Sequence, residues 1–291
     1  MSVVIPRSQR QLPYCVLLAS RPLSSSAAAA ASVRRKDPVQ DALQMAQALT
    51  SRDRVFSVIL SSEANGQKSS LGEVAPENVI YQPRHRGTAH EVLWALLALE
   101  RRADQGAPLI FVPTDHVVSD RDTMVRSLTE MGLWIQSDPY VYLLGAAPEG
   151  PHDELGYIIP WYDARDTPAA VYEFVERPDM HRARNLINAG GLWNTFIFGG
   201  TFHTLLAMFQ PRFERTIIAM RAAMHMGSAQ AQNARLLSTL YGRLSEVDLS
   251  EEVLAAKVED LKVLRVPNCG WWPLKAPQQG SAAAQRVDRG P

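Results

Sequence analysis

Residues 109–120 read LIFVPTDHVVSD, and this stretch decides the predicted fold. Residues 109–113 are apolar or favour extended structure, the run is too short for a helix, and polarity changes abruptly at Thr114 and Asp115. The pattern predicts a buried parallel strand that ends in a carboxylate. Ligands of open α/β sheets bind beyond the carboxyl ends of the strands, so Asp115 is placed to hold a metal ion or a substrate hydroxyl. The alternative is that Asp115 only caps the turn or the next helix.

Further short apolar runs alternate with helical patterns on both sides of this stretch. Strands are expected at residues 14–19, 54–61, 78–81 and 140–146, and helices at 38–50, 92–102 and 119–134. Thr88 has the chemistry of an N-cap for the helix at 92–102, and Ser119 is expected to start the next one. Strands that alternate with helices favour a parallel sheet covered on both faces.

The pattern changes after residue 148. Short strands are expected at 156–160, 170–175 and 194–198, with a helix at 180–189. We expect this insertion to form a lip over the sheet, where a second substrate would lie. Helical patterns follow at 202–226 and 229–244, and a late strand at 261–266.

Composition excludes several classes of protein. The 291 residues contain 30 Lys plus Arg and 30 Asp plus Glu, so no basic surface for nucleic acid or for an anionic membrane is expected. No run approaches the ~18 apolar residues that cross a bilayer. The two cysteines, Cys15 and Cys269, are far apart and suit a reducing compartment, which predicts a cytoplasmic protein.

The first 36 residues differ from the rest in composition. They contain a Ser/Ala tract at 24–31 and basic residues but no acidic residue. This composition is typical of an organellar transit peptide, and the alternative is a poorly specified or disordered terminus. The predicted division is therefore 1–36 as terminus, 37–275 as the main domain and 276–291 as a frayed tail.

Common nucleotide and metal motifs are absent. No G-x-G-x-x-G and no Walker A sequence occurs, so neither a dinucleotide fold nor a P-loop NTPase is supported. His85 and His90 are five residues apart and would not share a helical face, so we expect no metal site from them.

Several segments in sequence order carry a resemblance to a known family. These are PENVIYQPRHRGTA (76–89), IFVPTDHVV (110–118), ELGYIIP (154–160), FVERP (174–178), GGLWNTFIF (190–198) and LRVPNCGW (264–271). Together they resemble the bacterial mannose-1-phosphate guanylyltransferase family of sugar-phosphate nucleotidyltransferases, over roughly residues 54–271. The resemblance implies an α/β fold with a Rossmann-like, GT-A-like mixed sheet flanked by helices.

The resemblance also implies a reaction and its residues. A sugar 1-phosphate oxygen would attack the α-phosphorus of GTP and pyrophosphate would leave, with Mg²⁺ as the cofactor that neutralises phosphate charge. Asp115 would bind Mg²⁺, and Arg177 would face the sugar phosphate where the family usually has Lys. The nucleotide would be bordered by Gln82, Arg86, Gly87, Thr88 and Ala89. The sugar would be held by Gly156, Tyr157, Glu176 and Asn194. Taken singly, Glu176 could end a strand and Asn194 could cap a turn.

The chain departs from the family pattern at both ends. The family's Gly-rich G-x-G-x-R loop, which cradles phosphates, is replaced by SRPLSSSAAAAA at 20–31. A P-K-Q element is reduced to Pro38, Val39 and Gln40, and Arg21 or Arg34 would have to replace the missing cations. After Trp271 the family continues with an Asp that serves the metal, whereas this chain has Trp272, Pro273 and Leu274.

Three hypotheses follow from the resemblance and the departures. The first is a nucleotidyltransferase that makes an NDP-sugar, in particular GDP-mannose. The second is a catalytically impaired homologue that binds nucleotide or sugar phosphate, or that regulates an active enzyme. The third is that a frameshift or a wrong start codon has altered the ends. The base, the sugar and the oligomeric state, a homo-oligomer included, stay open.

Overall fold

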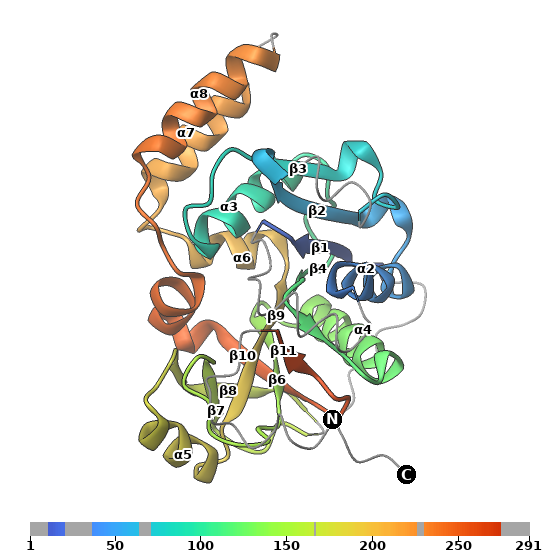
Figure 1. Cartoon of the computed structure of the whole chain (residues 1–291), viewed down its shortest axis with the longest axis vertical. Helices are drawn as coiled ribbons and strands as arrows, with labels where there is room; N and C mark the ends of the chain where they lie inside the picture. Colours follow the sequence, from blue (N-terminus) through green and yellow to red (C-terminus); the bar gives the residue numbers. More distant parts are fainter. Residues whose placement is uncertain (1–10, 21–36, 64–70, 166, 226–229, 275–291) are drawn as a thin grey trace.

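The computed structural model describes residues 11–20, 37–63, 71–165, 167–225 and 230–274. Within them lies a nine-stranded mixed sheet of order β3-β2-β1-β4-β9-β6-β10-β8-β7 (Figure 1). Its strands are β1 (Tyr14–Leu18), β2 (Val55–Leu60), β3 (Val79–Gln82), β4 (Leu109–Pro113), β6 (Val141–Ala146), β7 (Tyr157–Pro160), β8 (Ala169–Val175), β9 (Leu192–Gly200) and β10 (Leu261–Val266). The mixed α/β architecture is confirmed.

Helices lie on both faces of this sheet, and two more project from it. They are α2 (Pro38–Leu49), α3 (Thr88–Leu99), α4 (Arg121–Ser137), α5 (Met180–Asn188), α6 (Phe202–Met208), α7 (Glu214–His225) and α8 (Gln230–Arg243). Short 3₁₀ turns lie at Arg52–Arg54, Ser61–Glu63, Pro76–Asn78 and Ala255–Asp260, and a π-helical turn lies at Ser250–Leu254. Among the described residues, no helix is both long and apolar enough to cross a bilayer.

The parallel part of the sheet is built around β1. This strand lies between β2 and β4, with Cys15 opposite Val55 on one side and Ile110 on the other. Every residue of β1 and of β4 is buried, which confirms the predicted buried strand at residues 109–113. The division that placed residues 1–36 outside the main domain therefore needs correction, because β1 is central to the sheet. Residues 1–10, 21–36 and 275–291, including the candidate transit peptide and tail, lie outside the described residues.

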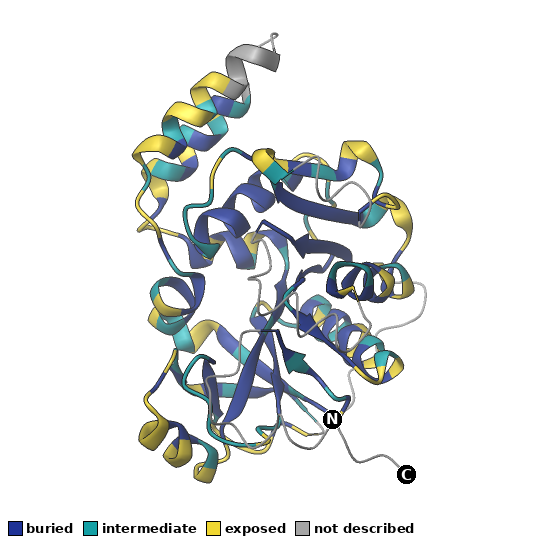
Figure 2. Cartoon of the chain, in the orientation of Figure 1, coloured by how far each residue is buried: buried dark blue, intermediate teal, exposed yellow. Residues whose placement is uncertain are grey.

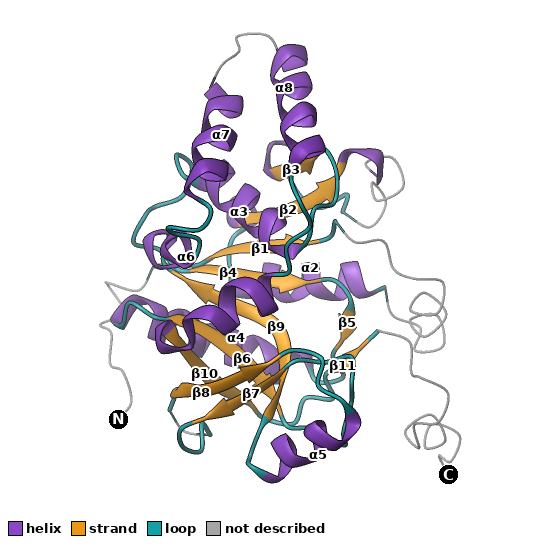
Figure 3. Ribbon diagram, turned by 90° about the vertical axis from the view of Figure 1, so that its left-hand side faces the viewer, coloured by secondary structure: helices purple, strands orange, loops and turns teal. Residues whose placement is uncertain are grey.

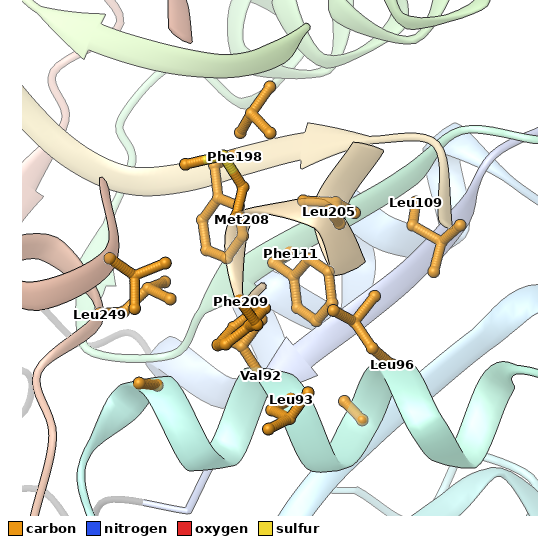
Figure 4. Packing of buried hydrophobic residues seen from close by; sticks show 14 of the residues in the cluster. Val92, Leu93, Leu96, Leu109, Phe111, Phe198, Leu205, Met208, Phe209 and Leu249 are labelled. Atoms are coloured by element: carbon orange, nitrogen blue, oxygen red, sulfur yellow. The ribbon is translucent and has the colours of Figure 1, made fainter. Parts of the chain in front are cut away.

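Two hydrophobic cores result from the alternation of side chains along each strand. Val16 packs with α3 in one core, whereas its neighbour Leu17 packs with α2 and α4 in the other. Figure 2 shows the strands and the inward sides of these helices as buried. In the core on the α3 side, Phe111 stacks on Phe198 with ring centroids 5.0 Å apart, beside Val92 (Figure 4). Burial on both faces explains why the strands read as continuous apolar runs.

The strands after residue 148 belong to the main sheet. β9 runs antiparallel between β4 and β6, and β7 pairs with both β8 and β9. The strands β9, β6, β10, β8 and β7 therefore form a closed ring, because β7 pairs back with β9. The lip expected from this insertion is thus built from strands of the sheet itself, and α5 lies against β7.

Some helix boundaries differ from the predicted ones. The N-cap of α3 is Gly87, and Thr88 is the first helical residue; no side chain caps this end. The N-cap of α4 is Asp120, one residue after the predicted start at Ser119. The predicted helix at 202–226 is divided into α6 and α7, because the chain turns at Pro211, where a proline cannot continue the hydrogen-bond ladder. Helices α7 and α8 lie side by side and project from the body (Figure 3).

A small second sheet joins the end of the described chain to the central strand. β5 (His116–Val117) follows β4 directly and pairs antiparallel with β11 (Trp272–Pro273). The amide of Leu274 donates to the carbonyl of Asp115 at 2.8 Å. These contacts bring the segment CGWWPL beside Asp115, although more than 150 residues separate them in sequence.

Candidate active site

A pocket lies at the carboxyl ends of β1 and β4. Leu18, Pro113, Thr114 and Asp115 form part of its wall. The hydroxyl of Thr114 donates to the carbonyl of Leu18 at 3.2 Å, which fixes the turn between strand and pocket. This is the edge of a parallel sheet at which ligands are expected.

Asp115 is available to this pocket because it does not cap a helix. Asp120 caps α4, since its carboxylate accepts a hydrogen bond from the amide of Thr123 at 3.0 Å. The backbone carbonyl of Asp115 accepts a hydrogen bond from Leu274, and Asp115 lines the pocket. Of the alternative that Asp115 caps the turn or the next helix, the part that concerns the helix does not apply, because Asp120 is the N-cap.

Three residues predicted to hold a sugar meet on another wall of the pocket: Gly156, Glu176 and Asn194. The amide of Asn194 donates to the carbonyl of Gly156 at 2.8 Å, so β9 and the start of β7 bring them together. A Cβ atom on Gly156 would collide with a carboxylate oxygen of Glu176. Glycine at this position therefore permits the observed place of Glu176.

Tyr157, the fourth residue predicted to hold the sugar, does not line the pocket. Its side chain is fully buried, and its hydroxyl donates to the carbonyl of His152 at 3.1 Å. The same hydroxyl accepts from the amide of His152 at 2.9 Å and from the indole nitrogen of Trp193 at 3.1 Å. In this structure Tyr157 therefore holds the 152–157 loop to β9.

We expect Tyr157→Phe to lower the free energy of unfolding by about 1–3 kcal/mol, because it removes the hydroxyl that accepts a hydrogen bond from the indole nitrogen of the buried Trp193. Urea denaturation followed by tryptophan fluorescence measures this loss. Binding of mannose 1-phosphate, measured by calorimetry, should stay within about twofold. A tenfold loss of affinity at unchanged stability would contradict this assignment and restore Tyr157 as a sugar contact.

Arg177 also lies outside the pocket wall. Its side chain is 53% exposed and forms an ion pair with Glu251 at 3.2 Å, and its Nε lies 3.9 Å from Glu176. Its backbone φ is 47°, in the left-handed region that larger residues adopt rarely. The predicted contact between Arg177 and a phosphate stays a prediction.

Of the five residues predicted to border the nucleotide, Thr88 alone is part of the pocket wall. Gln82 and Ala89 are fully buried. The turn at 86–89 is bonded to the last turn of α8 and to the chain that follows it. Arg86 Nε donates to the carbonyl of Tyr241 at 2.8 Å, and the amide of Ala89 donates to the carbonyl of Val247 at 3.1 Å.

Two further contacts complete this attachment. The amide of Val247 donates to the carbonyl of Arg86 at 3.2 Å, and the amide of Leu249 donates to the hydroxyl of Thr88 at 2.8 Å. A Cβ atom on Gly87 would overlap the backbone of Val247. Gly87 thus permits the close approach of the Val247 backbone, which belongs to another part of the chain.

The polar residues of the pocket that were not predicted include Glu91, Asp248 and Ser250. Glu91 is 2% exposed and accepts a hydrogen bond from the amide of Ser20 at 3.3 Å. Its place in the sequence could have indicated a site residue, because it is a carboxylate within the apolar run of α3. Asp248 accepts from the amide of Ser250 at 2.8 Å, and Ser250 accepts from the amide group of Asn194 at 3.4 Å. No motif marks Asp248 or Ser250, because a loop distant in sequence brings them here.

Carboxylates are the charged groups in the described part of the pocket wall. Among the described residues its wall has four carboxylates and no Lys, Arg or His; the carboxylates are Glu91, Asp115, Glu176 and Asp248. Oxygen acceptors of this kind bind hydroxyl groups and cations, but they repel phosphate that lacks a counterion.

His116, next to Asp115, does not supply the missing positive charge. Burial lowers the pKa of His116, and nearby Asp115 and Asp41 oppose that effect only in part. The ring is therefore neutral at pH 7 and packs beside Trp271, with ring centroids 6.1 Å apart.

The donors present fit one mode of Mg²⁺ binding. Nowhere in the described part of the chain do three His, Cys, Asp or Glu side chains group so as to hold a metal ion. Mg²⁺ is usually bound by one or two carboxylates together with phosphate oxygens and water. Asp115 fits that role as a single carboxylate. Pro273 lines the pocket in the segment where a second metal carboxylate was expected, and proline has no such group.

Comparisons with known proteins found relatives that share part of the sequence. "Alginate biosynthesis protein AlgA" of Pseudomonas syringae pv. tomato is 30% identical over 137 residues, which are 46% of this chain and 28% of that protein. "Mannose-1-phosphate guanylyltransferase" of Sinorhizobium fredii is 24% identical over 213 residues, which are 72% of this chain and 40% of that protein. The chain thus spans well under half the length of these curated relatives.

Two solved structures share the fold. The "mannose-1-phosphate geranyltransferase" of Thermus thermophilus has a TM-score of 0.72 at 20% identity, covering 90% of this chain and 76% of that one. The "mannose-6-phosphate isomerase" of Helicobacter pylori has a TM-score of 0.70 at 15% identity, covering 90% of this chain and 100% of that one. At such identities the likeness supports the fold alone. The profile described as "Nucleotidyl transferase" matches residues 21–224, which is more than half of the sequence. With the fold and this match in agreement, the chain belongs to the nucleotidyl transferase family.

Proposed function

We propose that this protein is a sugar-1-phosphate nucleotidyltransferase that converts mannose 1-phosphate and GTP to GDP-mannose and pyrophosphate. In this reaction a phosphate oxygen of the sugar forms a bond to the α-phosphorus of GTP, and the bond to the leaving pyrophosphate breaks. The observation that carries the proposal is the meeting of Asp115, Gly156, Glu176 and Asn194 at one pocket. These residues come from separate segments of the resemblance, and all face the carboxyl-end edge of the sheet.

The residues of the pocket have distinct roles in this proposal. Glu176 accepts hydrogen bonds from sugar hydroxyls, while Asn194 is oriented by Ser250 and by the amide of Phe196, which donates to its side-chain oxygen at 3.0 Å. Asp115 would hold Mg²⁺ together with phosphate oxygens, and the ion would supply positive charge against the charge that develops on the phosphates. The chain positions the reacting groups, which is the main contribution a protein makes to phosphoryl transfer.

One observation favours the alternative of a catalytically impaired homologue. The described wall of the pocket offers no cationic side chain for the phosphates. Arg177, the nearest predicted candidate, is paired with Glu251. The carboxylates of this described wall accept hydrogen bonds from hydroxyl groups and repel polyphosphate, which suits a protein that binds a sugar phosphate or regulates an active enzyme.

A pyrophosphate-release assay on the full chain separates the two functions. GTP, mannose 1-phosphate and MgCl₂ are supplied together, with the reaction lacking mannose 1-phosphate as the control, and calorimetry measures binding of each substrate. Release that depends on mannose 1-phosphate supports the enzyme. Binding of either substrate without any release would leave the binding protein as the function.

A further inference from the structure

Phe196 has an unusual backbone conformation inside the pocket. Its φ is 58°, which for a bulky residue other than glycine is a genuine outlier. It lies in β9 where the register with β6 shifts between Leu143 and Gly145, so the strand bulges at this point. Strained conformations persist only where the surrounding structure enforces them, and they cluster at ligand sites.

Side chains on both sides of Phe196 enforce this conformation. The oxygen of the Asn194 side chain accepts from the amide of Phe196 at 3.0 Å. The hydroxyl of Thr195 accepts from the amide of Ile197 at 3.2 Å and donates to the carbonyl of Leu144 at 2.7 Å. The bulge is therefore fixed by the same Asn194 that faces the pocket, and the two residues are positioned together.

The phenyl ring of Phe196 is held against the core. It packs edge-on against Phe198 with ring centroids 5.8 Å apart, and Phe198 in turn stacks on Phe111 (Figure 4). The residue lines the pocket beside Asn194 and Thr195. A ring supported from behind in this way cannot move deeper to make room for a larger ligand.

We propose that Phe196 sets the size limit of the sugar site and makes it selective for hexose phosphates without an acylamino substituent. This inference rests on the proposed sugar-phosphate site. An acetamido group in place of a hydroxyl adds an acetyl group to the ligand. In the wall that Phe196 shares with Asn194 and Glu176, this added group meets the Phe196 ring, which its contact with Phe198 keeps in place.

The test measures binding of a matched pair of ligands by calorimetry with MgCl₂: mannose 1-phosphate and N-acetylmannosamine 1-phosphate. The proteins are the wild type, Phe196→Ala, Phe196→Gly and Trp161→Ala, a control in which an exposed aromatic residue outside the pocket is removed. We expect the Kd ratio of the acetylated to the plain ligand to fall at least about tenfold in both Phe196 variants, and to stay unchanged in Trp161→Ala.

The outcomes separate this inference from the proposed function. A Kd ratio that is the same in the wild type and both Phe196 variants overturns the size limit while the sugar site stands. Absence of binding of both ligands to every protein overturns the sugar site and the size limit together. Binding without pyrophosphate release leaves the size limit intact and removes only the catalytic activity.

Comparison of the two variants also tests the backbone strain. Both remove the ring, but alanine keeps a Cβ in the left-handed region whereas glycine adopts it freely. The folding equilibrium constant of Phe196→Gly should exceed that of Phe196→Ala roughly tenfold in urea denaturation. In an ordinary strand glycine would be the less stable of the two, so the reverse order would show that the positive φ is not present in solution.

Discussion

Asp115→Asn is expected to slow pyrophosphate release by about 100- to 1000-fold, which is the usual effect of removing one strong electrostatic contact from a transition state. Asparagine keeps the size of the side chain and one oxygen, but it removes the negative charge. In the described wall Asp115 is the carboxylate at the tip of the central strand, and no group of three protein ligands stands behind it. The loss of a single ligand is therefore not compensated by others.

The matched control is Asp122→Asn, an exposed carboxylate in the first turn of α4 that does not line the pocket. Its release rate should match that of the wild type within about twofold, because its interaction with the helix dipole affects stability by only a few tenths of a kcal/mol. Urea denaturation of all three proteins checks that Asp115→Asn is folded. Equal release rates in Asp115→Asn and Asp122→Asn would remove Asp115 from the mechanism.

Much of the fold could be predicted from the sequence because local signals were strong. The apolar runs at 109–113 and 140–146 are too short for helices and are bounded by turns, and both form buried strands, β4 and β6. The position of Asp115 just after β4 could also be predicted, because the sequence changes abruptly from apolar to polar there. The ring of strands could not be predicted, since pairing of β7 with both β8 and β9 depends on contacts between distant segments.

The candidate site was predicted in part for the same reason. Asp115, Gly156, Glu176 and Asn194 each adjoin or lie in a strand, and the topology brings them to one edge. Asp248 and Ser250 lie in the segment between α8 and β10, where no periodic pattern sets their position. Conversely, the 86–89 turn has the composition of a ligand-binding turn, yet its backbone bonds Val247 and its Arg86 and Thr88 side chains bond Tyr241 and Leu249.

This attachment makes Gly87 the glycine at which we expect the largest loss of stability. Gly87→Ala should lower the free energy of unfolding by about 2–5 kcal/mol, the sum of about 1–2 kcal/mol for a Cβ at positive φ and about 1–3 kcal/mol for overpacking. The φ of Gly87 is 81°, and an added Cβ would lie 2.6 Å from both the backbone nitrogen and the carbonyl carbon of Val247. Backbone atoms cannot rotate away as a flexible side chain can.

Two other glycines separate the strain from the collision. Gly190 also has a positive φ, 83°, but an added Cβ would meet nothing within 4 Å, so Gly190→Ala should lose only the first contribution, about 1–2 kcal/mol. Gly150 has open space and no positive φ, so Gly150→Ala should leave stability nearly unchanged. Urea denaturation of the three variants measures each contribution. Equal losses in Gly87→Ala and Gly190→Ala would mean that Val247 moves aside at little cost, and that residues 247–249 do not hold Asp248 and Ser250 at the pocket through this contact.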